Sequence, residues 1–243
     1  MKLRHTFRNV LLTSLIVLLT ACNDSNNTTA MNGAGNGAGN GNSSGGDNHQ
    51  DTELVFEVDD FQPLTAAETT TLLFVREEEK MARDVYLKLY DQWQKKTFQN
   101  IATKSEQQHM DAVKVLLDGY GLNDPVISND IGEFTDTDIK TLYRQLLVDG
   151  EDSLEDALQV GAYIEEFDLI DLVDARLEAM NGSNPEPIIV TYSRLLCGSR
   201  NHLRAFVKQI EADGVTYQAQ LLSQDEVDLI VDSEQEDCGS ITE

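Results

Sequence analysis

The chain has 243 residues and carries 43 acidic against 18 basic side chains, for a net charge of −25. Such an excess of negative charge repels nucleic acid and anionic lipid, so it excludes a nucleic-acid-binding role. The same charge attracts cations without selectivity, and the acidity alone is therefore no sign of a metal site.

The first 21 residues predict a signal peptide. Lys2, Arg4 and Arg8 form a basic start. Residues 10–19 then form an apolar run that is short for a membrane-spanning helix. We therefore expect residues 1–21 to direct export rather than to belong to the folded protein.

The apolar run ends in Leu19-Thr20-Ala21-Cys22, which resembles the lipobox of bacterial lipoproteins. Cys22 is then the lipidated first residue, and its acyl chains would hold the protein to a membrane. We expect an exported protein, lipid-anchored to the bacterial cell envelope and, if the source is Gram-negative, to the outer membrane. An ordinary signal peptide, or a short membrane anchor with a chance cysteine, is the alternative.

Residues 22–52 are rich in Asn, Gly, Ser and Thr, with almost no apolar content. Such a segment cannot bury enough surface to offset its ordering entropy, so it predicts a disordered tether. Residues 53–243 suit one helical domain with a sizeable core. We divide this domain into a core at 64–214 and a C-terminal short helix and tail at 215–243.

The domain shows helical periodicity and almost no strand pattern. Thr65, Ser153 and Ser223 are predicted N-cap residues, and Pro185 suits a first helical turn. The predicted helices cover residues 66–94, 98–120, 135–148, 154–180 and 185–213, with a last short one after Ser223. This pattern predicts an all-α, ferritin-like four-helix bundle with a long connection between helices two and three that contains an extra short helix.

In such bundles, Glu and His side chains from four helices converge on two metal ions. On the first helix Glu78 lies on an apolar face, which favours it as a ligand over Glu77. Glu79 has Arg83 four residues on, which is typical of a solvated ion pair. The alternative is a charged run that faces water.

On the second helix, Glu106 and His109 are three residues apart and lie on one side, so both can reach a common pair of cations. The Glu-x-x-His motif by itself also occurs by chance in acidic helices. On the third helix, Glu165 and Asp168 share one stripe, and His202 lies inward on the fourth.

A symmetrical site would carry Glu three residues before His202, where this chain has Ser199, a poor ligand for iron or manganese. Asp168 is expected to supply the missing oxygen; otherwise the second site is weak or empty. No Lys or Arg is expected on the inward stripes, so these buried acids require a cation. The predicted metal ligands are Glu78, Glu106, His109, Glu165, Asp168 and His202.

Four segments carry a family resemblance: 76–86 (REEEKMARDVY), 105–113 (SEQQHMDAV), 164–168 (IEEFD) and 198–206 (GSRNHLRAF). Over about residues 64–232 the chain resembles the ferritin-like domain-of-unknown-function family numbered 2202. The resemblance implies a ferritin-like fold with a di-metal centre and no established substrate. It also implies that the serine before the last histidine is normal in the family.

Two classes of function follow. One is a redox enzyme with two metal ions, iron first and manganese or zinc as alternatives, that reduces peroxide or oxygen or acts as a ferroxidase with an unknown electron donor. Tyr192 is expected to be core or a neighbour of that centre. The other is a non-catalytic metal-binding or structural envelope lipoprotein. Iron storage in a closed cage is a weaker third option, because a lipid-anchored domain on a long tether suits a closed shell poorly. A homodimer is compatible with either class.

Two cysteines lie in the helical domain, Cys197 and Cys238. An exported protein can keep a disulfide, so a bridge that pins the C-terminal tail is one interpretation. Two unpaired thiols are the other, because sequence does not show proximity.

Overall fold

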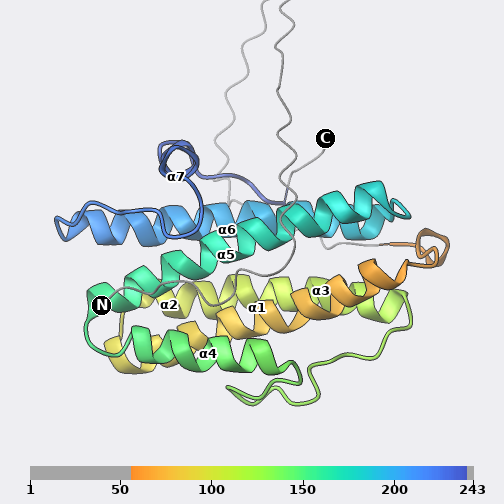
Figure 1. Ribbon diagram of the computed structural model, residues 1–243, viewed down its shortest axis with the longest axis horizontal. Helices are drawn as coiled ribbons and strands as arrows, with labels where there is room; N and C mark the ends of the chain where they lie inside the picture. Colours follow the sequence, from red (N-terminus) through yellow and green to blue (C-terminus); the bar gives the residue numbers. More distant parts are fainter. Residues whose placement is uncertain (1–55, 240–243) are drawn as a thin grey trace, which may run out of the picture. The chain divides into compact units, whose positions relative to one another are not determined.

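The computed structural model describes residues 56–239, and the regular secondary structure within them is helical (Figure 1). Four long helical segments form the bundle. They are α1 (Ala66–Trp93), the continuous run of α2 (Lys96–Asn100), η2 (Ile101–Glu106) and α3 (Gln107–Gly119), then α5 (Leu154–Asn181) and α6 (Glu186–Ala212). The short elements are η1 (Val58–Asp60), α4 (Thr137–Asp149) and α7 (Gln224–Val231). The predicted all-α bundle is confirmed, with α4 as the extra helix in the long connection.

The expected signal peptide, the lipidated Cys22 and the whole tether at 22–52 lie outside the described residues. Among residues 56–239, no helix is long and apolar enough to cross a membrane.

The predicted helix starts hold because side chains satisfy the first free backbone N–H groups. The Glu68 N–H donates to Thr65 Oγ1, and the Thr65 N–H donates to the Glu68 carboxylate. Ser153 and Ser223 accept hydrogen bonds in the same way at the starts of α5 and α7. Such N-caps contribute about 1 kcal/mol each.

The four long segments form a ring in which α1 contacts α3 and α5, and α6 also contacts α3 and α5. In Figure 1 the α5–α6 pair lies over the pair made by α1 and α2–α3, with α4 beside α1 and α7 on α6. One aromatic group in the core joins three of these segments, with ring centroids 5.2 Å apart for Tyr86 and Phe206 and 5.6 Å for Phe98 and Phe206. The interior of the ring is where the predicted ligands would have to meet.

The second long helix differs from the prediction because residues 101–106 form a π-helix rather than an α-helix. A π-turn adds a residue to the helical turn, which changes the side chains that face the bundle interior. Such turns are frequent at functional sites. Apolar periodicity does not reveal one, because it assumes a constant 3.6-residue turn.

The charged run of α1 is buried, contrary to the alternative that it faces water. Lys80 is 0% exposed; its ammonium donates to Asp84 and to the carbonyl of Asp130. Arg83 donates to Asp84 and to the Asn129 side chain. These two cations bond to Asp84 rather than to any predicted metal ligand, and they are buried on a different side of α1. The reason is that the connection between α3 and α4 covers a second side of α1.

The C-terminal segment folds back onto the bundle and is tied to α6. A disulfide joins Cys197 of α6 to Cys238, so the structure contains the bridge that the sequence left open. Arg200 and Arg204 both donate to the carboxylate of Glu236 in the same segment. The tail is therefore held by a covalent bond and by charge-assisted hydrogen bonds.

We predict that Cys238→Ser lowers the free energy of unfolding by about 2–4 kcal/mol, because the disulfide constrains the unfolded chain. Urea denaturation followed by circular dichroism measures this. The reduced wild-type chain should match the variant, and an unchanged midpoint in both would contradict the bridge.

Candidate metal centre

Five buried side chains from the four long segments meet in the bundle interior. Glu79 comes from α1, Glu106 ends η2, His109 lies in the first turn of α3, Glu165 comes from α5 and His202 from α6. They form two overlapping groups, Glu79–Glu106–His109 and Glu106–Glu165–His202. In each group one ligand atom per residue lies within 4.8 Å of the others. Glu106 belongs to both.

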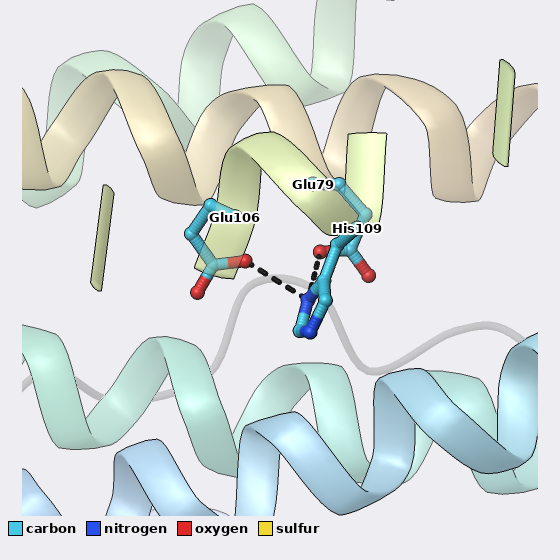
Figure 2. Close-up of side chains that lie close together, drawn as sticks. All are labelled: Glu79, Glu106 and His109. Atoms are coloured by element: carbon cyan, nitrogen blue, oxygen red, sulfur yellow. Dashed lines mark hydrogen bonds and ion pairs between the residues drawn. The ribbon is translucent and has the colours of Figure 1, made fainter. Parts of the chain in front are cut away.

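The first group lies between α1 and α3 (Figure 2). His109 Nδ1 is 3.0 Å from Glu79 Oε2 and 3.1 Å from Glu106 Oε2. Figure 2 shows both carboxylates directed at the same ring nitrogen. Three donor atoms are thus close to one point, with all three residues at most 8% exposed.

The second group repeats this arrangement on the other side of Glu106. His202 Nδ1 is 3.0 Å from Glu106 Oε1 and 3.3 Å from Glu165 Oε2. The two imidazole rings are stacked, with centroids 5.5 Å apart. Each oxygen of Glu106 therefore faces one histidine, which is the arrangement of a carboxylate shared by two metal ions.

Both oxygens of Glu106 are buried without a hydrogen-bond partner. Each histidine carries at most one hydrogen on Nδ1, so that nitrogen can donate one hydrogen bond. The geometry of that bond is met between His109 and Glu79 and between His202 and Glu165, and not toward Glu106. A buried carboxylate without donors is costly unless a cation compensates it. Glu106 is thus close to two nitrogens without being hydrogen-bonded, as expected for a ligand of metal ions.

The charges in this cluster shift the pKa values of its members. Burial disfavours the charged imidazole, but Glu165 and Glu106 outweigh it and raise the pKa of His202 to about 9. Glu79 and Glu106 likewise raise the pKa of His109 well above its usual range. Burial raises the pKa of Glu79 to about 7, although His109 opposes it. Burial alone would raise the pKa of Glu106, but His202 and His109 hold it below its usual range.

Two further side chains position the ligands. The Tyr86 hydroxyl, 0% exposed, donates to Glu165 Oε1. Ser105 Oγ lies 2.6 Å from Nε2 of His202, which fixes the ring so that Nδ1 faces the carboxylates. Loss of a hydrogen-bond partner that orients a metal ligand typically lowers metal affinity about 10- to 100-fold. The sequence analysis singled out neither residue, because neither one is itself a metal ligand.

Gly198 and Ser199 explain how α6 approaches the site. A Cβ on Gly198 would lie 2.4 Å from His109 Nε2, so the absence of a side chain makes room for that ring. The Ser199 hydroxyl donates to the carbonyl of Leu195 in its own helix. The Ser199 hydroxyl is therefore engaged within its own helix, in line with its poor suitability as a ligand for iron or manganese.

The structure brings together four of the six predicted ligands, Glu106, His109, Glu165 and His202. The remaining two, Glu78 and Asp168, are buried next to the cluster but belong to neither group. Glu77 is excluded as an alternative, because its carboxylate accepts the N–H groups of Thr135 and Asp136.

Glu79 is the residue that the sequence analysis misplaced. The predicted solvated ion pair with Arg83 is wrong, because Glu79 is 1% exposed and Arg83 bonds to Asp84. The signal was present in the sequence. Apolar residues lie seven and four residues before Glu79 and three and seven after it: Leu72, Val75, Ala82 and Tyr86. Charge pairing with Arg83 concealed this stripe, which is more fully buried than that of Glu78.

The fold and the cluster together define a class: a helical-bundle protein with two overlapping carboxylate–imidazole groups, each of which could hold a metal ion. The chain belongs to the family described as "Uncharacterized protein domain (DUF2202)", and the sequence model of that family matches residues 68–234.

Similar proteins share this domain without an assigned activity. The uncharacterized protein MJ0754 of Methanocaldococcus jannaschii is 45% identical over 175 residues, which cover 72% of this chain and 92% of that protein. The crystal structure of the hypothetical protein MJ0754 from Methanococcus jannaschii aligns with a TM-score of 0.68 and 44% identity, over 72% of this chain and 97% of the other. These names state no ligand, so the function has to be argued from the site.

We predict that Gly198→Ala lowers affinity for the ion beside His109 by about 10- to 100-fold, because the added methyl group displaces the ring. Ser199→Ala is the matched neighbour and should leave affinity unchanged. Titration of both variants with Mn²⁺ gives the comparison. Equal affinities would show that His109 is not a ligand.

The metal-free chain should lose stability as pH rises. His202 has a folded-state pKa of about 9 against 6.5, so its ion pairs stabilise the fold fully below about pH 6.5, and this contribution is lost through pH 9. The pKa of Glu79 is raised from 4.5 to about 7. Its contribution to stability therefore also falls as pH rises, between about pH 4.5 and pH 7. Thermal melts with chelator should therefore show a lower melting temperature at about pH 9 than at about pH 6.

Saturating Mn²⁺ should oppose this trend, because metal ligands must be deprotonated and binding tightens as pH rises. His202→Ala is the control, and it should flatten the dependence of the metal-free chain. A metal-free melting temperature that rises with pH would contradict the ion pairs described here.

Proposed function

We propose that Glu79, Glu106, His109, Glu165 and His202 hold two metal ions, with Glu106 shared between them, and that this centre carries out redox chemistry. The observation that carries the proposal is the buried Glu106 carboxylate, which has no hydrogen bond and faces one histidine nitrogen with each oxygen. Mixed carboxylate and imidazole ligands suit iron and manganese. We propose iron first, with manganese or zinc as the alternatives.

The ferritin-like arrangement expected from the sequence supports a redox role by analogy of fold alone. Glu79, Glu106, His109, Glu165 and His202 would hold the ions, and ferrous ions bound there would be a source of two electrons for dioxygen or peroxide. Reduction of one hydrogen peroxide to two waters also consumes two protons, and an external donor must then return the electrons. In this chain the Tyr86 hydroxyl orients Glu165, and the Ser105 hydroxyl orients His202.

Burial of the site contributes to selectivity. Glu106 and Glu165 are 0% exposed and Glu79 is 1% exposed, so bulk water has little access to these carboxylates. Low polarity around charged groups strengthens their interaction with a cation. The chain would therefore hold its ions firmly and admit only small reactants to them.

We also propose that the centre works at the cell envelope. The support is the signal-peptide pattern of residues 1–21 and the lipobox that ends in Cys22. An anchor at Cys22 and a tether over residues 22–52 would hold the helical domain near a membrane without burying it.

A structural role is the second candidate, and one observation favours it. The raised pKa of both histidines and the lowered pKa of Glu106 mean that the cluster can neutralise part of its own charge with protons. The bundle can then fold without redox-active ions. In that case a single redox-inert ion, or protons alone, would hold the four segments together.

The test is metal analysis of the purified full-length chain, followed by mixing of the ferrous form with peroxide. The redox proposal expects about two iron ions per chain and a fast absorbance change. One tightly held zinc ion and no response to peroxide would overturn it in favour of the structural role.

Glu106→Ala with His202→Ala should abolish metal binding while the helical circular dichroism signal stays. Glu155→Ala is the matched control, because Glu155 is an exposed acid in the first turn of α5. That variant should keep both the metal and the peroxide reaction. Loss of metal in both variants would show that general acidity, rather than this site, holds the ions.

A further inference from the structure

The disulfide between Cys197 and Cys238 lies beside the dinuclear centre, at the turns of α6 that meet it. Gly198 and His202 are four residues apart and share the side of α6 that faces the centre, where Gly198 leaves room for one imidazole ring and His202 provides the other. Cys197 and Asn201 are also four residues apart, and each directly precedes one of those two residues. The sulfur pair is therefore attached to the helix one residue away from the centre.

The two sulfur atoms differ in their access to solvent. Cys197 is 0% exposed. Cys238 is half-buried and lies between two exposed residues of the tail, Asp237 and Gly239. Its Sγ is bonded to Cys197 and accepts a hydrogen bond from the Asn201 side chain at 3.3 Å. An external thiol can therefore reach the sulfur of Cys238, whereas the sulfur of Cys197 is enclosed by protein.

Contacts other than the disulfide hold the tail against α6. Arg200 and Arg204 both donate to the carboxylate of Glu236. The Asn201 side chain donates to the carbonyl of Glu236 and accepts its N–H. These charge-assisted and amide hydrogen bonds do not depend on the S–S bond, so reduction would leave Cys238 next to α6. The bond can then break and form again without unfolding of the tail, as a reversible redox couple requires.

The thiol pair matches the electron demand of the proposed centre. Reduction of one hydrogen peroxide to two waters consumes two electrons and two protons, and oxidation of two thiols to one disulfide releases the same numbers. Within residues 56–239, Cys197 and Cys238 are the only cysteines. The helical domain thus contains one thiol pair that can give two electrons, and this pair adjoins the centre.

We propose that Cys197 and Cys238 are the immediate electron donor to the dinuclear centre. The two thiols form the disulfide, their electrons return the oxidised ions to the reduced state, and their protons replace those that peroxide reduction consumes. The net reaction converts two thiols and one hydrogen peroxide into one disulfide and two waters. An external dithiol then reduces the disulfide by thiol–disulfide exchange at Cys238. This inference rests on the proposed function, because it needs a centre that reduces peroxide.

Thiol analysis of the full-length, iron-loaded chain tests the inference. The chain is reduced with a phosphine, freed of reductant in the absence of oxygen and mixed with a limiting amount of hydrogen peroxide. The absorbance of oxidised iron should rise and then fall as the disulfide forms, with about one disulfide per peroxide consumed. Alkylation and mass spectrometry of the peptides that contain Cys197 and Cys238 count the free thiols. The same chain, stripped of metal by a chelator, is the control and should keep its thiols over that time.

Cys238→Ser extends the test to repeated turnover. With dithiothreitol supplied, this variant should stop reducing peroxide once its iron has been oxidised, while its iron content and helical circular dichroism signal stay. Glu234→Gln changes an exposed residue of the same tail and is the matched control. It should turn over as wild type does.

The possible failures separate this inference from the proposed function. If peroxide oxidises the iron and both thiols stay free, or if Cys238→Ser turns over as wild type does, the inference is overturned while the redox centre stands. Equal rates of thiol oxidation with and without metal would also overturn it, because peroxide would then attack the cysteines directly. If peroxide does not oxidise the bound iron, the proposed function fails and the inference fails with it.

Discussion

The constraint on which this structure depends is the compensation of buried negative charge. Nine acidic side chains are buried in the described bundle, and each must find donors or cations because an isolated carboxylate in an apolar interior is costly. Four of them, Glu68, Glu77, Asp84 and Glu166, bind backbone or side-chain donors and thereby hold loops onto the bundle. The other five converge in the interior, where the polypeptide offers too few donors.

The same segments that make the bundle stable also position the interior acids. Two consecutive residues at the end of the π-turn serve the cluster, since Ser105 contacts His202 and Glu106 faces both histidines. Consecutive residues of a regular helix point about 100° apart, so they rarely serve one site. Gly198 then allows α6 to approach His109. The irregular helical turn at residues 101–106 thus coincides with the residues that build the site.

Much of this was accessible from the sequence, and the failures have a common cause. Caps and turn residues located the helices to within a few residues, because they act locally. Glu106, His109, Glu165 and His202 were identified because few acids and histidines lie on apolar stripes. Glu79 was missed because Arg83 was expected to pair with it, whereas Arg83 bonds to Asp84 and to Asn129 of the distant connection that covers α1. A charged run looks solvated until a distant segment is known to bury it.

The cluster is nearly symmetrical about Glu106, and this bears on the missing acid of α6. Each half has one histidine and one terminal glutamate, which is Glu79 from α1 or Glu165 from α5. Both halves therefore have the same set of side chains without a contribution from Ser199. Gly198 on α6 instead admits the His109 ring, because even a Cβ at that position would lie 2.4 Å from Nε2. Among the described acids, Glu106 alone pairs with both imidazoles. Loss of a terminal acid would therefore disturb one half, whereas loss of Glu106 would disturb both. Glu106 is therefore the residue through which the two halves are coupled.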